Sequence, residues 1–157
     1  MEPKLEKILD AVKKAFTEDM PFNRHIGIKV DKLEENYAQL SFDMKDELVG
    51  NHITGVLHGG VISTVLDAVG AITGIARFAI TAFKKSNGSE KNPLSALSGS
   101  GTIDMRVDYL RPGRGKYFIA SSTILRAGSK LTVTRMELRN DKDELIAVGT
   151  GAYIIGK

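Results

Sequence analysis

The sequence has no cysteine and no tryptophan, and aromatic residues make up only 6% of it. Without cysteine there is no disulfide, no thiolate metal site and no cysteine nucleophile, which fits a reducing compartment. The scarcity of aromatic rings argues against a surface that stacks nucleic-acid bases. The net charge of +3 is too small to indicate nucleic-acid binding by itself. We therefore expect no nucleic-acid partner.

The sequence also lacks long uncharged apolar runs. None approaches the roughly 20 residues that a transmembrane helix needs. The opening stretch "MEPKLEKILDAVKKAF" carries charges throughout, unlike a secretory signal. With 157 residues, 42% hydrophobic and 26% charged, the composition is that of an ordinary globular chain with one core. We expect a single domain over residues 1–157, located in the cytoplasm and without a membrane span.

Hydrophobic periodicity divides the chain into helical and extended segments. It predicts an amphipathic helix over residues 1–20, ended by Pro21, and a long apolar helix from about 60 to 83. Extended segments are predicted at 26–34, 37–44, 101–110, 116–126, 130–140 and 144–155, the last four forming an antiparallel meander. This order indicates an α+β fold in which a curved antiparallel sheet of about six strands wraps a long central helix, with an extra N-terminal helix. Strands of this length leave one sheet face partly bare, which favours a homodimer or homotetramer.

The long helix contains a single acid, Asp67. At 100° per residue, the opposite side of the helix is an apolar stripe, predicted to face the core and made of Ile62, Val65, Leu66, Val69, Ile72, Thr73 and Ala76. The small residues Ser63, Gly70, Ala71 and Gly74 lie close to the direction of Asp67. Small residues let a ligand or another backbone come near. Two interpretations stay open: a carboxylate that faces a cleft or a subunit interface, and an ordinary solvated aspartate.

A histidine and two glycines, His58, Gly59 and Gly60, begin the same helix. The first turn of a helix has N–H groups without internal partners, and the helix dipole adds positive charge there. Glycine lets a carbonyl oxygen approach those donors, where a developing oxyanion is stabilised. Asp67 could hold or deprotonate the attacking water. The alternative is a plain turn before a helix.

The two stretches "LHGGVISTVLDAVGA" and "GTIDMRVDYLRPGRG" resemble the hotdog-fold thioesterases of the PaaI-like and YigI-like branch, and the similarity extends from about Ile26 to Ile155. The resemblance implies an acyl-CoA thioesterase of fatty acid metabolism that hydrolyses a thioester to a free acid and coenzyme A without a cofactor. It also implies a homo-oligomer whose subunits join their sheets edge to edge and share active sites.

The resemblance assigns roles to individual residues. Asp67 matches the catalytic acid, either general base or nucleophile. Gly59 matches the glycine whose N–H polarises the thioester carbonyl, and His58 shapes that turn. Thr102 matches a hydroxyl residue from the partner subunit that helps to hold the water. The upstream polar contact falls to Asn51 or His52, because the usual spacing points to His52 although the usual residue is asparagine.

Further residues are expected to bind substrate. Gly60 is included as the second glycine of the helix start, Ser63 because it lies close to the direction of Asp67, and His52 as the alternative upstream polar residue. Basic residues flank two turns, Arg111, Arg114 and Lys116 at "RPGRG" and Arg126 and Lys130 at "AGS". The resemblance implies that these turns meet coenzyme A phosphates, which suits arginine chemistry. Solvated surface charge explains them equally well. The polar stretch from Lys84 to Ser98 is predicted to be a loop that shapes the acyl pocket.

Other chemistries are less consistent with the sequence. His25, His52 and His58 show no helical i, i+4 pair, so a zinc site is not expected. Ser63 lacks the Gly-x-Ser-x-Gly context of a serine hydrolase. A non-catalytic acyl-CoA-binding module is the main alternative to a thioesterase, and a hydratase on the same fold is another.

Overall fold

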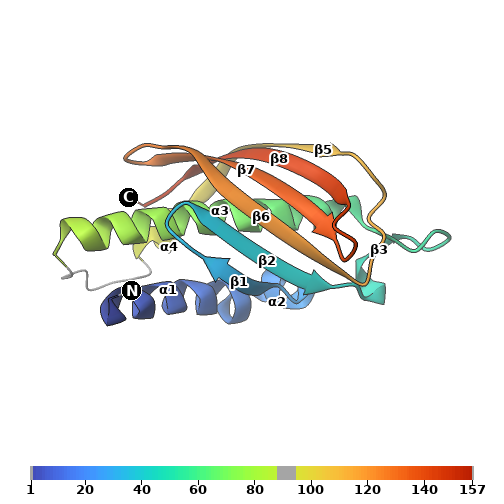
Figure 1. Ribbon diagram of the computed structural model, residues 1–157, viewed down its shortest axis with the longest axis horizontal. Helices are drawn as coiled ribbons and strands as arrows, with labels where there is room; N and C mark the ends of the chain where they lie inside the picture. The colour runs from blue at the N-terminus through green and yellow to red at the C-terminus, as the bar shows by residue number, and fades with distance from the viewer. Residues whose placement is uncertain (1, 88–94, 157) are drawn as a thin grey trace.

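A long helix lies beneath a six-stranded antiparallel sheet that curves over it (Figure 1). The computed structural model describes residues 2–87 and 95–156. Its helices are α1 (Pro3–Lys14), α2 (Pro21–Ile26), α3 (Gly59–Lys85) and α4 (Ser95–Ser98), with a π-helical turn η1 (Ala15–Asp19) and a 3-10 turn η2 (Asp46–Leu48). Its strands are β1 (Lys29–Leu33), β2 (Tyr37–Asp43), β3 (Val49–Asn51), β4 (Val56–Leu57), β5 (Gly101–Tyr109), β6 (Tyr117–Ala127), β7 (Leu131–Asn140) and β8 (Leu145–Ile154). The predicted α+β architecture is confirmed.

The strand order differs from the predicted meander. The sheet runs β1-β2-β6-β7-β8-β5, so only β6, β7 and β8 are joined as a meander. β5 pairs with β8, for example Thr102 with Tyr153, and forms one edge of the sheet. The connection from β5 to β6 therefore passes across the ends of β7 and β8. Short-range patterning predicts strands but not which strand a distant one will pair with.

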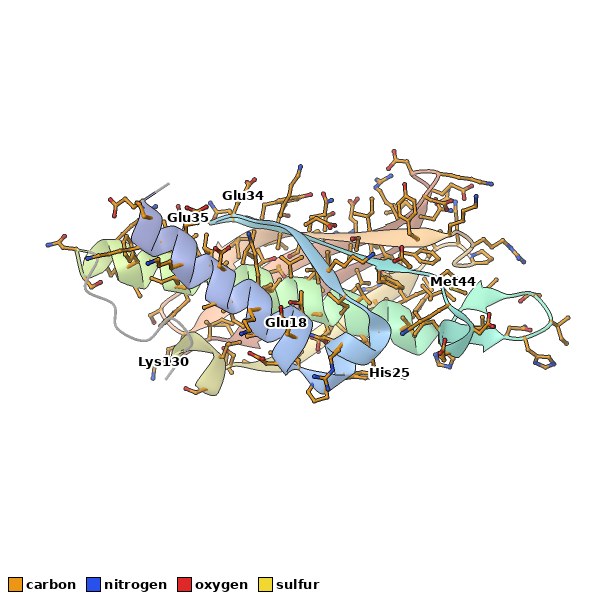
Figure 2. The ribbon with its side chains drawn as sticks, turned by 90° about the horizontal axis from the view of Figure 1, so that it is seen from below. Glu18, His25, Glu34, Glu35, Met44 and Lys130 are labelled. Carbon is orange, nitrogen blue, oxygen red and sulfur yellow. The ribbon has the colours of Figure 1, made fainter. Side chains whose placement is uncertain are left out.

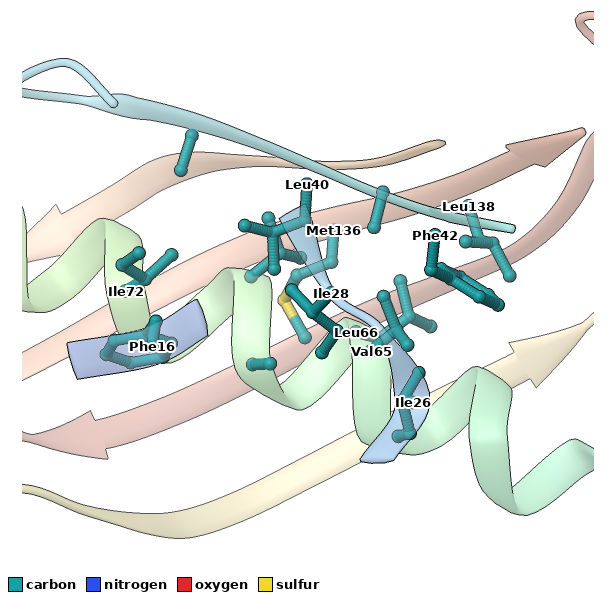
Figure 3. Close-up of a cluster of buried hydrophobic side chains, with 14 of the residues drawn as sticks. Phe16, Ile26, Ile28, Leu40, Phe42, Val65, Leu66, Ile72, Met136 and Leu138 are labelled. Carbon is teal, nitrogen blue, oxygen red and sulfur yellow. The ribbon is translucent and has the colours of Figure 1, made fainter. Parts of the chain in front are cut away.

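The predicted core stripe of α3 is confirmed. Ile62, Val65, Leu66, Val69, Ile72, Thr73 and Ala76 are all buried. Val65, Leu66 and Ile72 lie among side chains from β2 and β7, including Leu40 and Met136 (Figure 3). By length and composition α3 is apolar enough to cross a membrane, but 61% of its most apolar window is buried inside the fold. It serves as the core helix of the sheet.

The N-terminal segment covers the face of α3 that points away from the sheet (Figure 2). α1 continues into η1, and Pro21 then begins α2 instead of ending all helical structure. The buried Asn23 side chain fixes this bend, because its Nδ2 donates to the Phe16 carbonyl at 3.1 Å and to Met20 Sδ at 3.3 Å. Gly27, with φ of 86°, ends α2 in the left-handed conformation. The strand predicted at 26–34 consequently begins later, at Lys29.

The predicted loop at 84–98 is only partly described. α3 extends to Lys85, and α4 occupies Ser95–Ser98. Residues 88–94 lie outside the described residues, so the loop there stays a prediction.

Candidate active site

Asp67 accepts a hydrogen bond from Thr102 within the same chain. The Thr102 Oγ1 to Asp67 Oδ1 distance is 2.8 Å, and it joins the middle of α3 to the start of β5. This differs from the expectation that the hydroxyl comes from the partner subunit. The difference follows from the sheet order, because β5 at the sheet edge passes beside α3. Among the described residues, the second carboxylate oxygen of Asp67 makes no hydrogen bond of standard geometry.

A cleft of about 310 Å³ opens beside this pair. Asp67, Thr102 and Thr64 supply hydroxyl or carboxylate groups to it, and most of the remaining lining is apolar. The apolar side chains come from α3, the N-terminal segment, α4 and the sheet: Phe16, Met20, Phe22, Ala68, Ala71, Ile75, Leu97 and Ile155. The interpretation of Asp67 as a carboxylate that faces a cleft is therefore the one that the geometry supports. Leu97 also places the end of the predicted 84–98 loop at this cleft.

The small residues predicted around Asp67 separate into three environments. Ala71 lines the cleft one helical turn after Asp67. Gly70 and Gly74 are buried, and an added Cβ there would meet side chains of the sheet. Ser63 donates to the Gly60 carbonyl at 3.0 Å and does not line the cleft. The space left by these small residues is thus filled by the protein itself, except at Ala71.

At the N-terminus of α3, His58 is the capping residue. Its Nδ1 accepts a hydrogen bond from the Gly60 N–H at 2.8 Å. This occupies the Gly60 donor, so Gly60 is not placed to bind a carbonyl oxygen through its N–H. The Gly59 N–H makes no hydrogen bond among the described residues. Gly59 therefore offers the free donor that an oxyanion requires.

The two upstream candidates lie on the β3–β4 hairpin, which extends from the body of the molecule (Figure 1). Asn51 Oδ1 accepts hydrogen bonds from the backbone of Ile53 and Thr54 at 3.0 and 3.3 Å, so this oxygen is used within the hairpin turn. His52 is exposed, and Ile53 is 83% exposed at the tip. Among the described residues, neither side chain forms a hydrogen bond with Gly59 or Asp67.

The basic residues form two separate groups. Arg111 and Arg114 lie near the N-terminus of α3 and donate to the carbonyls of Leu145 and Thr54, both at 2.8 Å. Arg126 and Lys130 lie at the far end of β6, roughly 35 Å away for a strand of this length. Lys130 lines a second cavity of about 530 Å³ near the end of α3. Within one chain, these basic side chains therefore cannot all bind the same coenzyme A molecule.

Gly59 and Asp67 do not converge within one chain. They are eight residues apart on α3, which is about 12 Å along the helix axis. Gly59 instead lines a shallow surface depression with Tyr109, Arg111 and Gly113. The donor and the carboxylate of one chain therefore cannot both touch one thioester carbonyl.

Two features of the site were not predicted from the sequence. Residues of the N-terminal segment line the cleft, although their spacing indicates only an amphipathic helix. Tyr153 lines it as well, and its alternation along a strand is typical of an ordinary core residue. No group of three or more histidine, aspartate or glutamate side chains suited to a metal ion occurs among residues 2–87 and 95–156.

Comparisons with known proteins identify the family of the chain. The family model of the thioesterase superfamily matches residues 54–147, more than half of the chain. Medium/long-chain acyl-CoA thioesterase YigI of Escherichia coli (strain K12) is 42% identical over 151 residues, covering 96% of each chain. A crystal structure of a thioesterase-superfamily-related protein from Shewanella oneidensis matches with a TM-score of 0.88 at 38% identity, covering 99% of this chain and 100% of that one. The E. coli PaaI protein, with a TM-score of 0.75 at 17% identity and coverage of 98% and 96%, shares the fold. The chain therefore belongs to the thioesterase superfamily.

Proposed function

We propose that this chain hydrolyses medium- or long-chain acyl-CoA to a free carboxylic acid and coenzyme A. The observation that carries the proposal is the Asp67–Thr102 pair at an apolar cleft of about 310 Å³. A carboxylate next to an apolar cleft suits the hydrolysis of a thioester whose acyl chain occupies that cleft. The name of the E. coli relative supports the chain-length class.

In the proposed reaction, Asp67 is the general base. Its free carboxylate oxygen takes a proton from water while the water oxygen bonds to the thioester carbonyl carbon. The carbonyl oxygen becomes an oxyanion, which a Gly59 N–H and the N-terminus of α3 stabilise. When the tetrahedral intermediate collapses, the carbon–sulfur bond breaks and the proton held by Asp67 passes to the sulfur. The products are the acid and the thiol of coenzyme A.

The separation of Gly59 from Asp67 favours a homodimer that shares its sites. β5 is a nine-residue edge strand with exposed residues such as Ile103, which is 60% exposed. Exposed edges of this length are usually covered. If two copies pair antiparallel through β5, the start of one strand lies beside the end of the other. Thr102 and Asp67 then face the partner's Tyr109, whose hydroxyl in each chain donates to the Gly59 carbonyl at 3.3 Å.

Mixing two inactive variants tests the shared site. A Gly59→Pro chain keeps Asp67, and an Asp67→Asn chain keeps the Gly59 N–H. In a mixed dimer, one of the two sites then has both groups intact. Random assembly gives half mixed dimers, so we expect about a quarter of the wild-type rate. Thiol release from acyl-CoA is the measurement.

The matched control pairs Asp67→Asn with Thr102→Val, two changes in the same half of the site. No mixed dimer of these variants contains an intact site, so the rate should not exceed the mean of the two separate variants. If purified mixed dimers of Gly59→Pro and Asp67→Asn show no recovery, the shared-site arrangement is wrong.

A chain-length panel of saturated acyl-CoAs tests the proposed activity. We expect free thiol to appear with kcat/KM rising from short to medium and long chains, because each buried methylene contributes about 0.8 kcal/mol. Tight binding without thiol release would instead identify a non-catalytic acyl-CoA-binding module. Hydration of an enoyl-CoA without thiol release would identify a hydratase.

The Ala71→Leu variant, assayed with the same panel, tests whether the acyl chain binds in the cleft. Leucine adds three carbons to the wall one turn from Asp67 and is a good helix former. We expect kcat/KM for the longest chains to fall by about tenfold or more while short chains change less than about twofold. Ala11→Leu, on α1 and outside the cleft lining, is the matched control. An unchanged profile would show that the acyl chain binds elsewhere.

A further inference from the structure

Tyr153 lines the cleft together with Asp67 and Thr102, yet its hydroxyl has no role in the reaction described above. The side chain is 1% exposed, and within the described part of the chain its hydroxyl has no hydrogen-bond partner. A buried hydroxyl without a partner is unfavourable to stability. Phenylalanine would fill nearly the same space without that penalty. A polar group at such a position points to use by the site.

The neighbouring backbone leaves room specifically for the hydroxyl end of this ring. An added Cβ at Gly151 would lie 2.6 Å from Tyr153 Oη, and an added Cβ at Gly70 would be closer still. Gly70 follows Asp67 by three residues, so the two lie on neighbouring turns of the same helix face. The glycine on α3 therefore lets the hydroxyl lie against the helix, one turn after Asp67.

The electrostatic environment keeps this hydroxyl protonated. Burial raises the pKa of Tyr153 well above its ordinary value, and the nearby Asp67 carboxylate raises the same pKa further. The group is thus a neutral hydrogen-bond donor at neutral pH. The strongest acceptor near it is the Asp67 carboxylate.

We propose that Tyr153 is a positioning residue for Asp67, donating a hydrogen bond to its carboxylate when substrate fills the cleft. The proposal rests on the proposed thioesterase function. Thr102 already donates to Oδ1 of the same carboxylate at 2.8 Å. Two donors fix the plane of the carboxylate, so that its remaining lone pairs face the water in the cleft. A carboxylate held by one donor can rotate away from the water.

Tyr153→Phe removes only the hydroxyl. We expect kcat to fall about tenfold with KM changed less than about twofold, because ground-state binding in the apolar cleft is retained. The midpoint of thermal unfolding should stay the same or rise, because no hydrogen bond that meets standard geometry is lost. Tyr37→Phe is the matched control: its hydroxyl donates to Gln39 Oε1 at 3.0 Å on β2, outside the cleft.

A second measurement separates positioning from packing. In an Asp67→Asn background, assayed at high enzyme concentration, Tyr153→Phe should change the residual rate less than about twofold, because Tyr153 acts through the carboxylate. If Tyr153→Phe lowers the unfolding midpoint and leaves kcat unchanged, the hydroxyl is structural and the inference is wrong. If the wild type releases no thiol from any acyl-CoA, the proposed function itself fails, which is a different result.

Discussion

Asp67→Asn is expected to lower kcat for acyl-CoA hydrolysis by about a thousandfold. General-base catalysis by one carboxylate typically contributes about 10²–10⁴-fold, and no other carboxylate of the described residues lines the cleft. Asparagine has nearly the same shape, and its Oδ1 can still accept the Thr102 hydrogen bond of 2.8 Å. KM and the unfolding midpoint should therefore change little. Steady-state thiol release with saturating substrate gives the measurement.

Asp10→Asn is the control for this change, since Asp10 is also on a helix but forms only an exposed ion pair with Lys13 at 3.5 Å. Its activity should match the wild type, because exposed pairs contribute little. An Asp67→Asn enzyme with more than about a tenth of the wild-type kcat would remove Asp67 from its proposed role as base.

Gly59→Pro is expected to lower kcat by about a hundredfold to a thousandfold, the usual effect of losing one oxyanion donor. Proline at the first position of a helix is well tolerated, and its missing N–H is the donor in question. His58, the preceding residue, has φ of −64° and ψ of 134°, which a following proline favours. The substitution thus removes the donor while the helix keeps its start. Circular dichroism and the unfolding midpoint check the fold, and thiol release gives kcat.

Gly59→Ala distinguishes the effect of the N–H donor from the effect of having no side chain at this position. It retains the N–H, and its Cβ would meet Tyr109 Cε1 at 3.5 Å, an ordinary contact. We expect Gly59→Ala to retain most of the wild-type activity, unlike Gly59→Pro. Equal losses in the two variants would mean that space around Gly59, and not its N–H, matters for the reaction.

The sequence predicts the parts of this fold that depend on local periodicity. The prediction of the core stripe of α3 is correct because burial repeats with the helical period from Ile62 to Ala76. The pairing of β5 with β8 was missed, since a strand's own pattern does not name its neighbour. The same pairing explains why Thr102 bonds to Asp67 of its own chain.

The candidate site was only partly predictable for a similar reason. Asp67 and Gly59 are notable in the sequence because an acid and a glycine are unusual in an apolar helix. Phe16, Met20 and Tyr153 are ordinary apolar or aromatic residues whose positions at the cleft depend on the bend at Asn23 and on the sheet. Likewise, the capping of Gly60 by His58 depends on a side-chain rotamer that no sequence pattern specifies.

The apolar character of α3 also bears on how the protein is made. Synthesis finishes α3 before it reaches β5, β6, β7 and β8, although these strands form most of the sheet that covers it. Until they emerge from the ribosome, the growing chain carries a 27-residue helix with the length and composition of a membrane span. Burial of the sheet-facing side of this helix is therefore completed only when the C-terminal strands have been made and have folded over it.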